Sequence, residues 1–204
     1  VTEEDMYYLT SKGKIRFPYL PKSMSHHGCY VASLGQFTRW LGKICEKEGI
    51  DIFCGFPGTE LLYEDKKVIG VRTGDRGIDK NGNPKPNYDQ GVDIHAKVTV
   101  LGEGPRGNLS KTLINKNDLM KGKNPQVWAI GVKELWQMPK GSVKAGYVAH
   151  TMGFPLGHDI FGGAFIYGMK NDILDIGLVL GLDYNDPAID PHHELQLLKT
   201  HPWI

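Results

Sequence analysis

Three glycines, Gly102, Gly104 and Gly107, have the spacing GxGxxG and directly follow an apolar, β-branched run of residues. Glycines at this spacing after a strand let backbone N–H groups and the start of a helix face a phosphate, which is the chemistry of a dinucleotide-binding turn. Two residues inside the motif oppose that chemistry. Pro105 has no N–H to donate, and Glu103 places a negative charge where a pyrophosphate would lie. A nucleotide-contacting turn and a simple glycine-rich strand turn therefore both stay open.

The chain on either side of these glycines also differs from a first βαβ unit. Such a unit has an acidic residue about 20 positions further on, which binds the ribose, whereas residues 121–125 read KGKNP. Before the motif, residues 56–73 have a hairpin pattern, and Asn81-Gly82 is a strong hairpin turn signal. Residues 94–101 are predicted to form a strand that enters the turn. A small antiparallel meander, not a helix, is expected to precede the glycines.

A second glycine pair, Gly162 and Gly163, lies inside an apolar and aromatic stretch that spans residues 147–169. Adjacent glycines in a strand-like stretch mark a bulge or a place where a ligand or another backbone comes close. One interpretation is a flat apolar ligand among Phe154, Phe161 and Phe165, with glycine N–H groups donating to its carbonyl oxygens. The other interpretation is a bulge in a packed sheet.

Histidines and cysteines give no recognisable metal site. His26 and His27 are adjacent but have no carboxylate or thiolate at a ligand spacing, so we expect no metal. His150 is one of several scattered histidines that we interpret as surface or hydrogen-bonded side chains. The three cysteines form no CxxC pair, and their odd number predicts no disulfide framework, which favours a reducing compartment.

The remaining patterns predict short elements. Apolar residues at helical spacing predict a helix over residues 36–48, followed after Gly49 by a strand that begins at residues 50–53. Strands are expected at 127–135 and 173–182, and a helix is expected from 192 to 200. Aromatic and cationic residues at 7–20 are typical of a loop on a membrane surface or of a segment packed on its own domain.

Composition excludes several classes of protein. The chain has 204 residues, 24 Lys and Arg against 23 Asp and Glu, and a net charge of +1, which indicates no nucleic-acid partner. The 26 glycines and 12 prolines between short apolar runs predict many turns and strands. There is no apolar run long enough to span a bilayer and no targeting signal. Since the chain starts at Val1, we expect a processed chain or a piece of a longer one.

Several long stretches together resemble one family, the electron transfer flavoprotein:ubiquinone oxidoreductases. They read HHGCYVASLGQFTRWLG, VIGVRTGDRGIDKNGNPK, AKVTVLGEGPRGNLSKTL, GVKELWQMP, HTMGFPLGHDIFGGAFIYGM and VLGLDYNDP. The resemblance covers the chain from about Tyr8 to its end, in one order and with similar intervening lengths. It therefore points to the middle portion of such an enzyme.

The resemblance implies an activity, cofactors and a location. Members of the family are peripheral proteins on the matrix side of the mitochondrial inner membrane, or of the bacterial cytoplasmic membrane. They pass electrons from reduced electron transfer flavoprotein to ubiquinone in the respiratory chain, through FAD and a four-iron four-sulfur cluster. The expected chemistry is electron transfer, with no side chain acting as acid, base or nucleophile.

The same resemblance assigns site residues. It implies that Gly102, Glu103, Gly104 and Gly107 lie near FAD, and that Gly162 and Gly163 donate backbone hydrogen bonds to the quinone, with Phe161 beside it. The family usually has a tyrosine where Phe161 stands here. The family's pyrophosphate fingerprint and cluster cysteines have no counterpart between Val1 and Ile204, so this chain alone is expected to bind FAD poorly and to ligate no cluster.

The expected fold class is α+β/α/β. Residues 1–119 would form a partial FAD-binding domain of the glutathione-reductase type, with a small antiparallel meander and a membrane-facing loop at 7–20. Residues 120–204 would form a mixed-sheet quinone-binding domain. Two alternatives stay open. One is a related flavin-dependent monooxygenase or prenyl reductase, and the other is a non-catalytic fragment that binds quinone or a membrane, or one segment of a split enzyme.

Overall fold

The computed structural model describes all residues from 1 to 204 and divides into two compact units. The first unit consists of Val1–Leu41 and Gln126–Ile204, and the second consists of Gly42–Pro125. Helix α1 (Leu34–Lys47) spans the division along the chain. Each unit is described by itself below.

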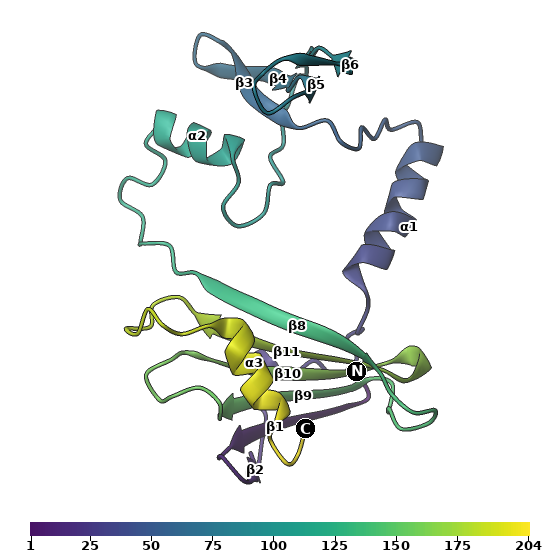
Figure 1. Ribbon diagram of the computed structural model, residues 1–204, viewed down its shortest axis with the longest axis vertical. Coiled ribbons are helices and arrows are strands. Elements are labelled where there is room, and N and C mark those ends of the chain that lie inside the picture. The colour runs from purple at the N-terminus through teal and green to yellow at the C-terminus, as the bar shows by residue number, and fades with distance from the viewer. The chain divides into compact units, whose positions relative to one another are not determined.

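The first unit is built on a six-stranded sheet with the strand order β2-β1-β9-β10-β11-β8 (Figure 1). Its strands are β1 (Glu3–Leu9), β2 (Lys14–Arg16), β8 (Ala129–Gln137), β9 (Tyr147–Gly153), β10 (Gly162–Met169) and β11 (Ile173–Gly181). Strand β1 runs parallel to β9, while the other neighbours pair antiparallel. Two short 3₁₀ turns, η1 (Lys22–Met24) and η2 (Lys170–Asp172), lie in the connections.

Helix α3 (Pro191–Lys199) packs on one face of this sheet, as Figure 1 shows. The helix begins where the Asp190 side chain accepts a hydrogen bond from the His192 N–H at 2.9 Å, with a proline in the first turn. Its Leu195 and Leu198 join a core that includes Leu178 of β11. Because side chains alternate along a strand, the neighbouring positions face the opposite side of the sheet. That opposite face carries the candidate site.

The second unit consists of two small antiparallel sheets and a helix. One sheet contains β3 (Gly58–Glu64), β4 (Lys67–Thr73) and β7 (Asp93–His95), and the other contains β5 (Arg76–Ile78) and β6 (Pro84–Asp89). Helix α2 (Leu109–Lys116) follows the glycine turn. The hairpin expected at 56–73 and the Asn81-Gly82 turn between β5 and β6 are confirmed, and so are the helix near 36–48 and the mixed sheet.

Two expected strands are absent. Strand β7 ends at His95, and residues 96–101 form no strand, although Val98 and Val100 are β-branched. Residues 50–53 are also irregular. Strand propensity alone does not make a strand, because the backbone also needs a neighbour to pair with. Only the short segment that pairs with β4 is therefore a strand.

Residues 7–20 are not one surface loop. Tyr7 and Leu9 are buried in the core because β1 pairs with β9 along its whole length, while Ile15 and Tyr19 are exposed. This pairing also places residues 1–41 with 126–204, whereas the expected division was 1–119 and 120–204. How the proposed FAD and quinone functions divide along the chain stays a prediction.

Candidate functional site

A cavity of about 380 Å³ lies beside the glycine pair at the start of β10. Phe161, Gly162 and Gly163 border it together, and Phe161 is 82 % exposed. Most of the other lining side chains are apolar; they include Met6, Met24, Met152, Ala164, Phe165 and Val179. We refer to this space as the glycine cavity. Its size and apolar wall suit a small flat ligand.

The two glycines are also required by the packing of the sheet. A Cβ atom on Gly163 would lie 1.9 Å from the carbonyl oxygen of Thr151, and one on Gly162 would lie 2.3 Å from that of Val179. Backbone of the neighbouring strands thus approaches both positions closely. A bulge, one of the two interpretations left open by the sequence, is absent between these strands, because β10 pairs with β11 in continuous register from Gly162 to Met169. Whether the glycine N–H groups meet a ligand stays a prediction.

A second cavity of about 420 Å³ adjoins the first. The two share three lining residues, His150, Phe165 and Tyr167, and the second also contains His26, Lys133, Val148 and Asp175. Lys133 Nζ donates to Asp175 Oδ2 at 2.9 Å, so this cavity has an ion pair in its wall. The shared residues form the boundary between an apolar space and a polar one.

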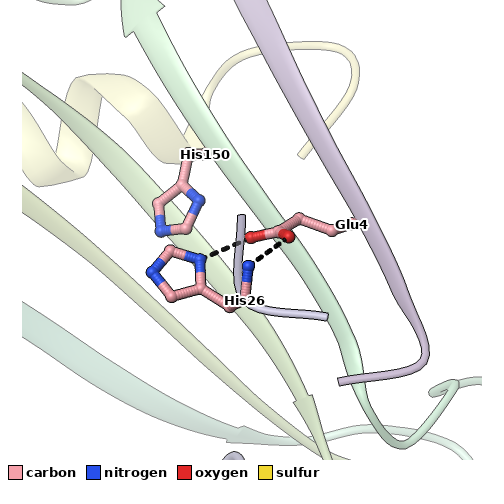
Figure 2. Close-up of side chains that lie close together, drawn as sticks. All are labelled: Glu4, His26 and His150. Atoms are coloured by element: carbon pink, nitrogen blue, oxygen red, sulfur yellow. Dashed lines mark hydrogen bonds and ion pairs between the residues drawn. The ribbon is translucent and has the colours of Figure 1, made fainter. Parts of the chain in front are cut away.

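Glu4, His26 and His150 meet at this boundary (Figure 2). Glu4 accepts two hydrogen bonds from His26. The backbone N–H donates to Oε2 at 2.7 Å, and the ring Nδ1 lies 2.5 Å from Oε1. One possible ligand atom from each of the three residues lies within 4.8 Å of the others. His150 Nε2 is 3.3 Å from the Tyr167 hydroxyl, while its Nδ1 is inaccessible and has no hydrogen-bond partner.

The surroundings shift the pKa values of these groups in consistent directions. Burial alone would raise the pKa of Glu4, but the hydrogen bonds from His26 outweigh burial and lower it. Burial, together with the neighbouring His26, lowers the pKa of His150 and keeps its ring neutral near pH 7. Burial and the Asp175 carboxylate raise the pKa of the Tyr167 hydroxyl, which therefore keeps its proton. The site thus holds a carboxylate, a neutral imidazole and a protonated phenol.

One carboxylate and two imidazoles are also ligand types for a transition-metal ion or zinc. Both oxygens of Glu4 are already engaged by His26, so the cluster needs no cation to satisfy its carboxylate. Sequence spacing does not group these residues, because Glu4 and His150 lie far from His26 along the chain. Glu4 lies on β1 and His150 on β9, and the parallel pairing of these strands brings the two residues together. This pairing cannot be predicted from the sequence of either strand alone.

The turn at Gly102 to Gly107 lies in the second unit and has a different arrangement. Glu103 accepts hydrogen bonds from the N–H groups of Leu109 and Ser110, at 3.1 and 2.7 Å. These hydrogen bonds lower the pKa of Glu103 to about 2, and the one from the Ser110 N–H has the largest effect. The carboxylate therefore takes the place of an anion at the start of α2. Space beside Gly102 and Gly104 remains open, so their contact with FAD stays a prediction.

Solved structures with a similar fold are flavin-dependent halogenases. A triple mutant of the flavin-dependent brominase Bmp2 superimposes with a TM-score of 0.56 at 12 % identity, over 95 % of this chain and 43 % of that one. The myxobacterial chondrochloren halogenase CndH gives 0.53 at 15 % identity, over 97 % of this chain and 41 % of that one. The chain therefore has the fold of a part of these flavin-dependent enzymes.

The similar sequences are those of electron transfer flavoprotein-ubiquinone oxidoreductases. Residues 128–204 match the family model described as the ubiquinone-binding domain of ETF-QO. The whole chain is 42 % identical to the probable electron transfer flavoprotein-ubiquinone oxidoreductase of Schizosaccharomyces pombe, 41 % to the Sus scrofa protein and 40 % to the Homo sapiens protein, all three mitochondrial. It covers 32–34 % of their lengths. The resemblance read from the sequence is confirmed: the chain is a relative of these oxidoreductases and spans about a third of their length.

Proposed function

We propose that this chain carries the quinone-binding part of an enzyme that transfers electrons from reduced electron transfer flavoprotein to ubiquinone. The observation that carries the proposal is the glycine cavity, because it is apolar, has the size of a small ring compound and is built largely from residues inside the matched ubiquinone-binding segment. A quinone head group would lie beside Phe161, with Gly162 and Gly163 at its carbonyl oxygens.

FAD and the iron–sulfur cluster belong to the proposal in different ways. The open backbone at Gly102 and Gly104 leaves room for contact with a flavin nucleotide in a domain of the glutathione-reductase type. Since Glu103 occupies the start of α2, the phosphates would bind elsewhere. Cys29, Cys45 and Cys54 are free cysteines, and we expect this chain to ligate no cluster.

A peripheral position on the mitochondrial inner membrane, on its matrix side, fits the surface of the first unit. None of the helices has both the length and the apolar character needed to cross a bilayer. Ile15, Phe17 and Tyr19 are exposed apolar side chains next to Lys14 and Arg16, a combination that suits contact with a lipid surface. This exposed segment, and not the buried Tyr7, would supply the membrane contact.

Binding of ubiquinone-1, which has a single isoprene unit, to the oxidised protein tests the proposal. Valine at Gly162 or Gly163 would disrupt the sheet, so Phe161→Ala is the better variant. Loss of one aromatic contact of about 0.5–1.5 kcal/mol corresponds to a dissociation constant raised about 2- to 13-fold. Phe53→Ala, at an exposed phenylalanine of the second unit, is the matched control and should leave the affinity unchanged.

The outcome also separates the alternatives. A protein that binds flavin but neither binds nor reduces the quinone would favour the related monooxygenase or prenyl reductase. A protein that binds quinone but shows no flavin absorbance and no reduction with its native partners would favour the binding module. Equal effects of Phe161→Ala and Phe53→Ala on quinone affinity would refute the glycine cavity as the site.

A further inference from the structure

Two residues of the glycine cavity have side chains that can pass on a proton, and both continue into the second cavity. They are Tyr167 and His150, joined at 3.3 Å between the hydroxyl and Nε2. Of the residues around the glycine cavity, these are the two with titratable side chains. The other wall residues are apolar, apart from Thr151, whose hydroxyl accepts a hydrogen bond from the Ala164 N–H.

Behind His150, the Glu4–His26 pair leads toward solvent. The side chain of His26 is 44 % exposed, whereas that of Glu4 is 6 % exposed. Figure 2 shows the His150 ring next to this pair, with one ring nitrogen on the side of the Glu4 carboxylate. The possible ligand atoms of the three residues lie within 4.8 Å of one another, so a small side-chain rotation would bring a Glu4 oxygen within hydrogen-bond distance of the His150 ring. A polar path therefore runs from an exposed imidazole to the wall of the apolar cavity.

We propose that this path, His26–Glu4–His150–Tyr167, delivers a proton from solvent to one carbonyl oxygen of a quinone bound in the glycine cavity. The inference rests on the proposed function, because it assigns a route to one of the two protons that quinone reduction consumes. Glu4 lies on β1, His26 lies in the segment before α1, and His150 and Tyr167 lie on β9 and β10.

The proton balance defines the role of each group. Reduction of a quinone to a quinol takes two electrons, supplied by a reduced flavin, and two protons. The path supplies one of these protons: an O–H bond forms at one quinone carbonyl oxygen as the Tyr167 O–H bond breaks, and the opposite carbonyl oxygen takes its proton from solvent. Tyr167 regains a proton from His150 Nε2, and His150 takes one at Nδ1 from the Glu4–His26 pair, which is refilled from solvent. Between turnovers, when the cavity is empty, His150 loses the Nδ1 proton to the Glu4–His26 pair and takes one at Nε2 from solvent, which restores the starting tautomer.

The charges around His150 are compatible with this relay. Glu4 from β1 and His26 face one side of the ring, and Tyr167 lies on the other. Asp175 and Lys133 share the second cavity with His150 and neutralise each other as an ion pair. The His150 ring is neutral and can accept a proton on one nitrogen while it donates from the other.

Tyr167→Phe and His150→Gln test the relay in the intact protein with its flavin. Loss of positioned proton transfer should lower kcat for quinone reduction about 10²-fold, whereas electron transfer to ferricyanide, which takes up no proton, should stay within about twofold. Glu4→Gln and His26→Asn should also lower kcat, with an increased solvent deuterium isotope effect. Tyr147→Phe, on β9 but outside both cavities, and His27→Asn, exposed beside His26, are the matched controls.

A readout that does not need turnover is ¹⁵N NMR of histidine-labelled protein. The relay requires His150 to rest with Nε2 protonated and Nδ1 free, and this state should persist in the Tyr147→Phe control. Resting protonation at Nδ1, or kcat values of Tyr167→Phe and His150→Gln equal to wild type, would overturn the relay while the proposed function stands. A wild-type protein that neither binds nor reduces quinone would instead refute the proposed function itself.

Discussion

Neighbouring residues of β11 should differ in how much they contribute to stability and to quinone binding, because they face opposite sides of the sheet. Leu178 is fully buried in the core, whereas Val179 is 37 % exposed and borders the glycine cavity. We therefore predict that Leu178→Ala lowers the stability of the first unit without changing quinone affinity. Val179→Ala should lower this stability less and should weaken quinone binding.

The magnitudes follow from burial. Leu178→Ala deletes three buried carbon groups, worth about 2.4 kcal/mol at about 0.8 kcal/mol each. The space left inside the core raises this to about 3–4 kcal/mol. Val179→Ala deletes two groups that are partly exposed and adjoin an existing cavity, so its cost should be about 1 kcal/mol.

Hydrogen exchange of the peptides from β10 and β11, measured through urea unfolding, would report the stability of this sheet. Ubiquinone-1 titration of the same variants would report the cavity. If Val179→Ala destabilised the sheet as much as Leu178→Ala, or if Leu178→Ala alone weakened quinone binding, the assignment of the two faces would be refuted.

Further predictions concern backbone packing and pH. Gly163→Ala should unfold the sheet or strongly reduce its melting temperature, because its Cβ would lie 1.9 Å from a carbonyl oxygen, whereas Gly131→Ala, with a nearest contact of 3.4 Å, should be tolerated; circular dichroism distinguishes the two. The hydrogen bond from Lys199, which has the largest effect, and the one from Trp136 lower the pKa of Glu134 to about 2. Because this folded-state pKa is depressed, its stabilisation is present above about pH 4.5 and is lost as the pH falls toward 2. Acid titration should therefore show a smaller loss of stability between pH 4.5 and 2 in Glu134→Gln than in wild type, and equal slopes would contradict the assignment.

Local sequence patterns predicted the elements that depend on local contacts. The helical spacing near Trp40 and the Asn81-Gly82 turn indicated α1 and the β5–β6 hairpin, because helices and tight turns form between residues close in the chain. The long stretches shared with the oxidoreductases indicated the resemblance to these enzymes, which the sequence relatives bear out. Gly162 and Gly163 were correctly singled out as positions of close approach, although the neighbour is strand backbone in regular register.

Long-range pairing decided what the sequence patterns left open. Residues 1–41 join the last part of the chain because β1 lies parallel to β9, and parallel pairing is invisible in the pattern of either strand. The same pairing brings Glu4 near His150. In the opening glycine motif, the sequence alone showed that Glu103 opposes a pyrophosphate. Only the folded chain showed why the charge is there: the carboxylate binds the first N–H groups of α2.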